Sequence, residues 1–242
     1  MFSIQKWVNF LHPLIKSVRE KLSAVEPDTL LDVDTWHGLL SEFGFNDENP
    51  HELPMSMISQ PGLGLRIWQY PNQFAPYMVW LASKSNLIGS YMEIGTRHGG
   101  TFVVQVETLR LLNPDFGAAV AVDLIDRPDL LAGYRYRQQD SQSKVFLQWL
   151  RKQFFDCIFI DGDHGYQGVK NDAESTIERC NVQVFHDISS DSCIDVGLYW
   201  REHKEAYKDT HDFFEFVDQY DSVEGSFLGI GVSCRKDWIV VK

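Results

Sequence analysis

Residues 155–166 read FDCIFIDGDHGY, an almost unbroken apolar run followed at once by carboxylates and an imidazole. An apolar run of this length, ended by a turn, is typical of a strand that is covered on both faces. A second run of this kind, AAVAV at residues 118–122, ends in Asp123. Buried strands that end in polar residues predict a parallel sheet whose ligand site lies at the carboxyl ends of its strands.

Strand-like and helix-like segments alternate on both sides of these runs. This alternation predicts an α/β fold with a doubly wound, Rossmann-like and mostly parallel sheet. Two short strand-like runs within residues 225–241 predict an antiparallel hairpin at the sheet edge. The predicted strands are 90–94, 118–123, 155–160 and 182–185, and the predicted helices are 74–83, 100–112, 141–152, 167–179 and 194–207.

The N-terminal part follows a different pattern and predicts a helical extension, residues 1–60, ahead of a main domain, residues 61–242. Apolar residues from Ile4 to Leu22 recur at helical spacing. The rest of the extension is interrupted by prolines, apart from one short helix predicted over 35–43. We interpret the first helix as packed on the main domain, and a lid over the active site or a dimer contact is the alternative.

The composition restricts the partners and the compartment. The chain of 242 residues carries 34 acidic and 22 basic side chains, a formal net charge of −12. Nucleic acids attract clustered Lys and Arg, so no nucleic-acid partner is expected. No run approaches 18 apolar residues, so no membrane partner is expected, and four dispersed cysteines are typical of a reducing, cytoplasmic compartment. We interpret most of the acidic side chains as surface groups that keep the chain soluble, and a few carboxylates as gathered at a site that holds a cation.

A glycine-rich turn follows the first predicted strand and leads into a helix, because residues 93–101 read EIGTRHGGT. Backbone N–H groups at such a turn contact a ligand. The P-loop pattern GxxxxGK[ST] fails because Thr101 stands at the Lys position, and the dinucleotide pattern GxGxxG fails because Arg97 replaces its second glycine. The spacing therefore favours a cofactor without phosphates.

Polar residues at two further strand ends extend the candidate site. Asp123 is placed to accept both ribose hydroxyls of an adenosine. Asp140 and Ser141 stand before the predicted helix 141–152, so either can cap that helix. A hydrogen bond from this segment to an adenine amino group is compatible with such a cap.

Two more strand ends place carboxylates near each other. Asp161 and Asp187 follow neighbouring predicted strands, and two close carboxylates repel unless a proton or a divalent cation lies between them. Oxygen ligands with one imidazole, here His186, suit Mg²⁺, Mn²⁺ or a similar ion. The alternative is that Asp161 caps its loop and His186 is a core histidine with satisfied hydrogen bonds.

Taken in order, these motifs resemble the class I S-adenosylmethionine-dependent methyltransferases. The similarity is greatest to the small-molecule O-methyltransferase group with a FIDGDHxY loop, which includes relatives of macrocin-type sugar O-methyltransferases and cephalosporin-hydroxylase-like proteins. It covers about residues 60–235 and implies a seven-stranded sheet whose last strand is antiparallel. The motifs that carry it are EIGTRHGGT at 93–101, Val122-Asp123, Asp140-Ser141, FIDGDHGY at 159–166 and Phe185-His186-Asp187.

The resemblance implies a set of residues around S-adenosylmethionine. Its methionine part would be surrounded by the end of the first strand and the glycine turn, its ribose and adenine would follow the next strand ends, and a segment before the first helix of the domain would close over it. The residues implied are Glu93, Gly95, Thr96, Gly99, Asp123, Leu124, Asp140, Ser141, Asp161, Gly162, Gln69 and Tyr70.

The resemblance also implies catalytic roles. In metal-dependent relatives the aspartate matching Asp161 and an acidic pair matching His186-Asp187 hold Mg²⁺, and the histidine matching His164 serves as general base. Here the first member of that pair is a histidine, which leaves the metal requirement or the identity of the ion open.

The expected function is methyl transfer to a hydroxyl of a small molecule, sugar or natural-product-like, with a divalent metal and His164 assisting. The expected partner is this small-molecule acceptor, whose identity stays open, as does a homo-oligomer. Three alternatives remain: a metal-independent methyltransferase acting on another small acceptor, a nicotinamide oxidoreductase, and a non-catalytic domain that keeps the cofactor fold.

Overall fold

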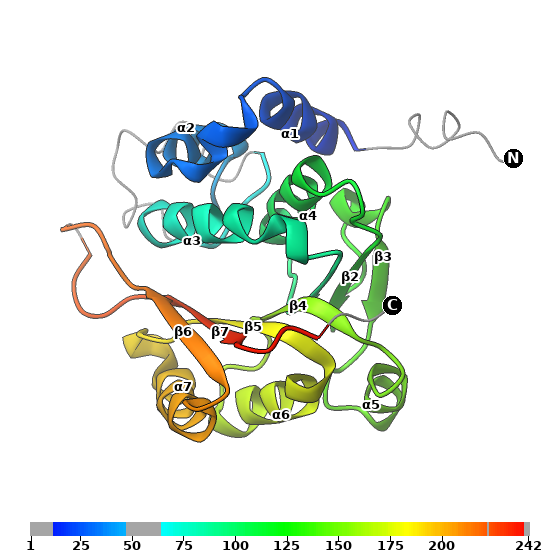
Figure 1. Cartoon of the computed structure of the whole chain (residues 1–242), viewed down its shortest axis with the longest axis vertical. Coiled ribbons are helices and arrows are strands. Elements are labelled where there is room, and N and C mark those ends of the chain that lie inside the picture. Colours follow the sequence, from blue (N-terminus) through cyan, green and yellow to red (C-terminus); the bar gives the residue numbers. More distant parts are fainter. Residues whose placement is uncertain (1–11, 47–63, 222, 240–242) are drawn as a thin grey trace, which may run out of the picture.

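The computed structural model describes residues 12–46, 64–221 and 223–239. One seven-stranded sheet, in the order β3-β2-β1-β4-β5-β7-β6, lies between two layers of helices. Helices α1 to α4 cover one face and α5 to α7 the other (Figure 1). The predicted doubly wound α/β fold is therefore confirmed.

The strands pair in parallel from β3 to β5, and β7 is antiparallel to both β5 and β6. This confirms a mostly parallel sheet with an antiparallel last strand. The strand order reverses between β1 and β4, the position at which α/β sheets bind ligands beyond their carboxyl ends. The strands are β1 Ser90–Ile94, β2 Ala118–Asp123, β3 Arg135–Gln138, β4 Phe155–Ile160, β5 Cys180–His186, β6 His211–Phe216 and β7 Ile230–Arg235.

The helices lie close to their predicted ranges, and side-chain caps explain two of the differences. Asp32 accepts a hydrogen bond from the Thr35 N–H at 2.8 Å and starts α2 two residues before the predicted start. Ser143 caps α5 through the Phe146 N–H at 3.2 Å, so the predicted cap at residues 140–141 is wrong. The helices are α1 Pro13–Ser23, α2 Val33–Phe43, α3 Pro71–Ser83, α4 Gly100–Leu112, α5 Lys144–Leu150, α6 Tyr166–Thr176 and α7 Ile194–Tyr207.

The terminal hairpin is formed by different strands from the predicted ones. Its strands are β6 and β7, joined in register from His211–Arg235 to Phe216–Ile230, and residues 236–239 form no strand. The sequence HDFFEF of β6 lies at the sheet edge, where most of its side chains are only partly covered. An edge strand needs no continuous apolar run, which explains why the pattern did not predict it.

Alternate residues of each central strand divide between two hydrophobic clusters, as the strand period of two requires. Tyr91 and Phe159 pack with α1 to α4, and Met92 and Ile158 pack with α5 to α7. Buried residues of α1 and α2 belong to the first cluster, so the described part of the predicted extension shares a core with the sheet. The boundary at residue 60, the lid and the dimer contact stay predictions, and residues 1–11 and 47–63 lie outside the described ranges.

One ion-pair network joins α1 to α4. Arg19 of α1 pairs with the buried Glu107 of α4, which also contacts Arg110 at 2.7 Å and accepts a hydrogen bond from the Tyr134 hydroxyl at 2.5 Å. Within the described ranges, none of the helices combines the length and apolarity needed to cross a bilayer.

If α1 is part of the core, removing one of its buried side chains destabilises the whole chain. Ile15 is 0% exposed, so Ile15→Ala should lower the free energy of unfolding in urea by about 2–5 kcal/mol. The neighbouring Lys16 side chain is 73% exposed, and Lys16→Ala serves as the control with a change within about 0.5 kcal/mol. Equal stability of the two variants would contradict this packing.

Candidate active site

A cavity of about 830 Å³ opens at the carboxyl ends of β1, β2, β4 and β5. Its size lies within the range of small-molecule sites. Tyr70 does not line it and is buried with its ring 4.8 Å from that of Phe227. The other predicted site residues all line it: Gln69, Glu93, Gly95, Thr96, Gly99, Asp123, Leu124, Asp140, Ser141, Asp161, Gly162, His164, His186 and Asp187.

The glycine turn after β1 passes against the loop after β4. Gly95 has a φ of 85°, and a Cβ built on it would lie 1.9 Å from the carbonyl oxygen of Asp161. Only glycine permits both this conformation and this approach. The turn and the Asp161 loop therefore form one packed wall of the cavity.

Asp123 fixes the other side of the glycine turn. Its Oδ2 accepts a hydrogen bond from the Arg97 N–H at 2.6 Å, and its Oδ1 accepts from the N–H groups of Leu124 and Ile125 at 2.6 and 3.2 Å. A carboxylate offers about four acceptor positions, so one remains on Oδ2 for a hydroxyl of a ligand. Asp123 thus orients the loop and still presents an acceptor to the cavity.

Glu93 is a buried carboxylate at the end of β1. It accepts hydrogen bonds from the Tyr91 hydroxyl at 2.7 Å and from Gln105 Nε2 at 3.4 Å. Burial raises the pKa of Glu93 well above its ordinary value, and the Tyr91 hydrogen bond opposes this shift. Its side chain lines the cavity, where a cationic ligand would favour the ionised form.

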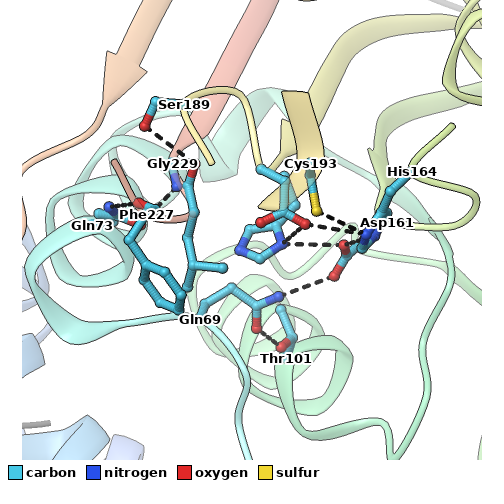
Figure 2. Close-up of polar contacts among 12 residues, drawn as sticks. Gln69, Gln73, Thr101, Asp161, His164, Ser189, Cys193, Phe227 and Gly229 are labelled. Atoms are coloured by element: carbon cyan, nitrogen blue, oxygen red, sulfur yellow. Dashed lines mark hydrogen bonds and ion pairs between the residues drawn. The ribbon is translucent and has the colours of Figure 1, made fainter. Parts of the chain in front are cut away.

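The centre of the site is the Asp161 carboxylate between two imidazoles. Its Oδ1 lies 3.1 Å from His186 Nδ1 and 3.3 Å from His164 Nε2. Its Oδ2 accepts a hydrogen bond from Gln69 Nε2 at 3.2 Å, and Gln69 in turn accepts one from the Thr101 hydroxyl (Figure 2). Gln69, which lies far from the strand ends in sequence, is thereby part of the cluster.

The charges of this cluster stabilise one another. Burial alone would raise the pKa of Asp161, but His186 and His164 outweigh it and lower that pKa to about 2. Burial alone would lower the pKa of His186, but Asp161 and Asp187 raise it well above its usual value. The hydrogen bond to Asp161 likewise raises the pKa of His164. The protonated His186 therefore supplies positive charge that the carboxylates require.

The cluster also has polar atoms without partners. Neither His186 Nε2 nor Asp187 Oδ1 has a hydrogen-bond partner within residues 12–46, 64–221 and 223–239, although both atoms are buried. Each such atom costs about 1–3 kcal/mol. Donor atoms of Asp161, His186 and Asp187 lie within 4.8 Å of one another, so the predicted metal residues are brought together and fit a divalent cation.

Several residues that line the cavity were not among the predicted site residues. Arg97 lies over the Trp68 ring at 4.2 Å, and the thiol of Cys193 lies 3.3 Å from His164 Nδ1. Phe227 enters from the loop between β6 and β7. These side chains belong to loops, where hydrophobic periodicity carries no information.

Residues 92–188 match the model of a family described as a methyltransferase domain. This span runs from β1 to the residue after Asp187 and includes Asp161, His164, His186 and Asp187. No curated protein matches the sequence.

The solved structures similar to the chain have low sequence identity to it. MycE methyltransferase from the mycinamycin biosynthetic pathway, solved with Mg, S-adenosylhomocysteine (SAH) and mycinamycin VI, has 16% identity and a TM-score of 0.50, over 82% of this chain and 57% of MycE. A candidate O-methyltransferase from Klebsiella pneumoniae has 15% identity and a TM-score of 0.49, over 93% and 91% of the two chains. The O-methyltransferase from Bacillus cereus, solved with SAH, has 14% identity and a TM-score of 0.48, over 90% and 97%.

Asp172 of α6 is a buried acid behind the cavity wall that the sequence did not single out. A Cβ on the cavity-lining Gly162 would lie 3.1 Å from its Oδ2. Burial raises the pKa of Asp172 from 3.8 to about 6, and the hydroxyl of Ser141 opposes this only in part. Because the folded-state pKa is the higher one, folding favours the protonated acid, and the chain loses stability as the pH rises through about 6.

The variant Asp172→Asn removes this pH-dependent loss. Its gain in unfolding free energy over the unmodified chain should grow from about 1 kcal/mol at about pH 4.5 to about 3 kcal/mol at about pH 8. Urea unfolding at the two pH values measures it. Glu174 of the same helix has a side chain 56% exposed, so Glu174→Gln is the control without such a trend. A pH-independent effect of Asp172→Asn would contradict the assignment.

Proposed function

We propose that the chain is a class I S-adenosylmethionine-dependent methyltransferase that methylates a hydroxyl group of a small molecule, sugar or natural-product-like. The domain match over residues 92–188 supports the enzyme class. The observation that carries the proposal is the position of the Asp161 cluster. It lies in the same cavity as Glu93 and Asp123, so a proton acceptor and a cofactor site adjoin each other.

The cavity walls fit the parts of the cofactor. Bound S-adenosylmethionine supplies a methyl group on a cationic sulfonium centre. In the proposal, the free acceptor position of Asp123 takes a ribose hydroxyl, and Glu93 faces the cationic methionine part. Asp140 and Ser141 border the adenine side, where Leu124, 68% exposed, offers an apolar surface.

A divalent cation fits the oxygen-containing set of Asp161, His186 and Asp187. The unpartnered Asp187 Oδ1 and the close donor atoms of the three side chains support it. When bound, such an ion would lower the pKa of an acceptor hydroxyl. The same three side chains also neutralise one another through the protonated His186, and this observation favours the metal-independent methyltransferase as the second candidate.

His164 is the proposed general base. Its side chain is 43% exposed, so an acceptor entering the cavity can reach it. Asp161 at Nε2 and Asp187 at Nδ1, 3.3 and 3.4 Å away, orient the ring. These acidic neighbours also raise the pKa of His164, and the neutral ring is the form that accepts the proton of the hydroxyl. The cavity must also hold the methyl group of the cofactor and the acceptor hydroxyl in line.

The cofactor assignment predicts the behaviour of Asp123→Ala in calorimetry with SAH. Loss of hydrogen bonds to a charged acceptor should weaken binding about ten- to hundredfold. Asp126 is a nearby exposed acid outside the cavity lining, and Asp126→Ala is the matched control with unchanged affinity. Because Asp123 also orients its loop, a thermal melt must first show that Asp123→Ala unfolds at the same midpoint temperature as the unmodified chain. Unchanged SAH binding by a folded Asp123→Ala rejects the ribose assignment.

The acceptor assignment predicts methyl transfer from labelled S-adenosylmethionine to members of a panel of sugars and phenols. His164→Gln should lower this rate about 10²- to 10⁴-fold with unchanged SAH affinity, while His37→Gln, on the remote helix α2, should leave it unchanged. Loss of activity on adding a chelator supports the metal, and survival supports the metal-independent candidate. Full activity of His164→Gln would exclude His164 as the base.

A further inference from the structure

A second set of donor atoms lies beside the Asp161 cluster. Cys193 Sγ is 3.3 Å from His164 Nδ1, and the same nitrogen is 3.4 Å from Asp187 Oδ2. One donor atom from each of the three residues lies within 4.8 Å of the others. Cys193 enters from the short helical turn before α7, and Figure 2 shows its sulfur directed at His164 beside Asp161.

The separations match the edges of a tetrahedral metal site. With Zn–N, Zn–O and Zn–S bonds of about 2.0–2.3 Å, neighbouring donors of a zinc site lie about 3.4–3.6 Å apart. The distances of 3.3 and 3.4 Å at His164 Nδ1 are close to these edges. Two of the three donor separations therefore match such a site, and the third, between Cys193 and Asp187, is at most 4.8 Å.

The donor types distinguish this set from the first. Thiolate and imidazole ligands suit borderline-soft ions such as Zn²⁺, whereas Mg²⁺ takes oxygen ligands. Asp187, 3% exposed, has an unpartnered Oδ1 among the described residues, so this carboxylate retains capacity for a ligand. Cys193 is only partly buried and lines the cavity, which leaves the set open to an ion from solution.

We propose that His164, Asp187 and Cys193 form a binding site for Zn²⁺ or a similar borderline-soft ion, which differs from the oxygen-containing set in its donors but shares Asp187 with it. On binding, the Cys193 thiol releases its proton to solvent and the thiolate coordinates the ion. Asp187 Oδ2 lies 3.4 Å from His164 Nδ1 and 3.5 Å from His186 Nδ1, so ions in the two sets compete for it.

A metal ion bound at this site would prevent His164 from acting as the general base. An imidazole that binds a metal through Nδ1 has used that lone pair and carries its proton on Nε2, so neither nitrogen can accept another proton. Zn²⁺ would thus inhibit methyl transfer. This consequence rests on the proposed role of His164, whereas the metal site itself rests only on the three donors.

The test uses Co²⁺ as a spectroscopic substitute for Zn²⁺ on the full chain. The unmodified chain should bind one Co²⁺ with a thiolate-to-metal charge-transfer band, and Zn²⁺ should abolish the band. Cys193→Ser should lose the band and bind Zn²⁺ at least about tenfold more weakly in calorimetry. Cys234→Ser is the matched control, because Cys234 lies on β7 outside the cavity lining, and it should keep both band and affinity.

A second readout follows the histidine directly. On adding one equivalent of Zn²⁺, the Nδ1 resonance of His164 should move in the ¹⁵N spectrum of the unmodified chain and stay in place in Cys193→Ser. Absence of the band, or equal Zn²⁺ affinity of the two proteins, overturns the site. SAH calorimetry on the metal-free chain separates the two proposals: absent SAH binding with intact Co²⁺ binding would reject the proposed function alone.

Discussion

The negative charge of Asp161, whose side chain is only 16% exposed, is the constraint on which the site depends. A carboxylate at the end of a central strand loses its hydration and requires positive charge or donors at close range. His186, His164 and Gln69 provide them at 3.1, 3.3 and 3.2 Å. These three partners come from the end of β5, the loop after β4 and the segment before α3. Neutralising one carboxylate therefore joins three separate parts of the chain around one cavity.

The sheet order makes this cluster possible. Reversal of the strand order between β1 and β4 leaves a crevice at their carboxyl ends. Gly95 allows the turn after β1 to reach the backbone of the Asp161 loop. Asp123 ties the same turn to the end of β2 through the Arg97 N–H at 2.6 Å. The cofactor side and the proton-accepting side of the proposed enzyme are thus held by one set of backbone contacts, not by two independent loops.

Prediction from sequence succeeded where a single physical requirement decides the residue pattern. Strands covered on both faces must be apolar throughout, and their ends define one edge, so β1, β2 and β4 could be predicted, and with them several residues that line the cavity. The edge strand β6 and the exposed β3, RYRQ, have no such requirement. Cys193 and Asp172 were not predicted for another reason. Their positions depend on how a loop and α6 pack against distant residues, and spacing along the chain does not encode this packing. Tyr70, predicted to close over the cofactor, instead lies in the core against Phe227.

The central claim is that one cavity brings the cofactor beside the Asp161 cluster. A crystal structure of the chain with SAH tests it most directly. The account predicts a ribose hydroxyl within about 3 Å of Asp123, the methionine part near Glu93 and the thioether sulfur directed toward Asp161 and His164. Density for SAH outside this cavity, or in it with the sulfur directed away from the Asp161 cluster, would contradict the account.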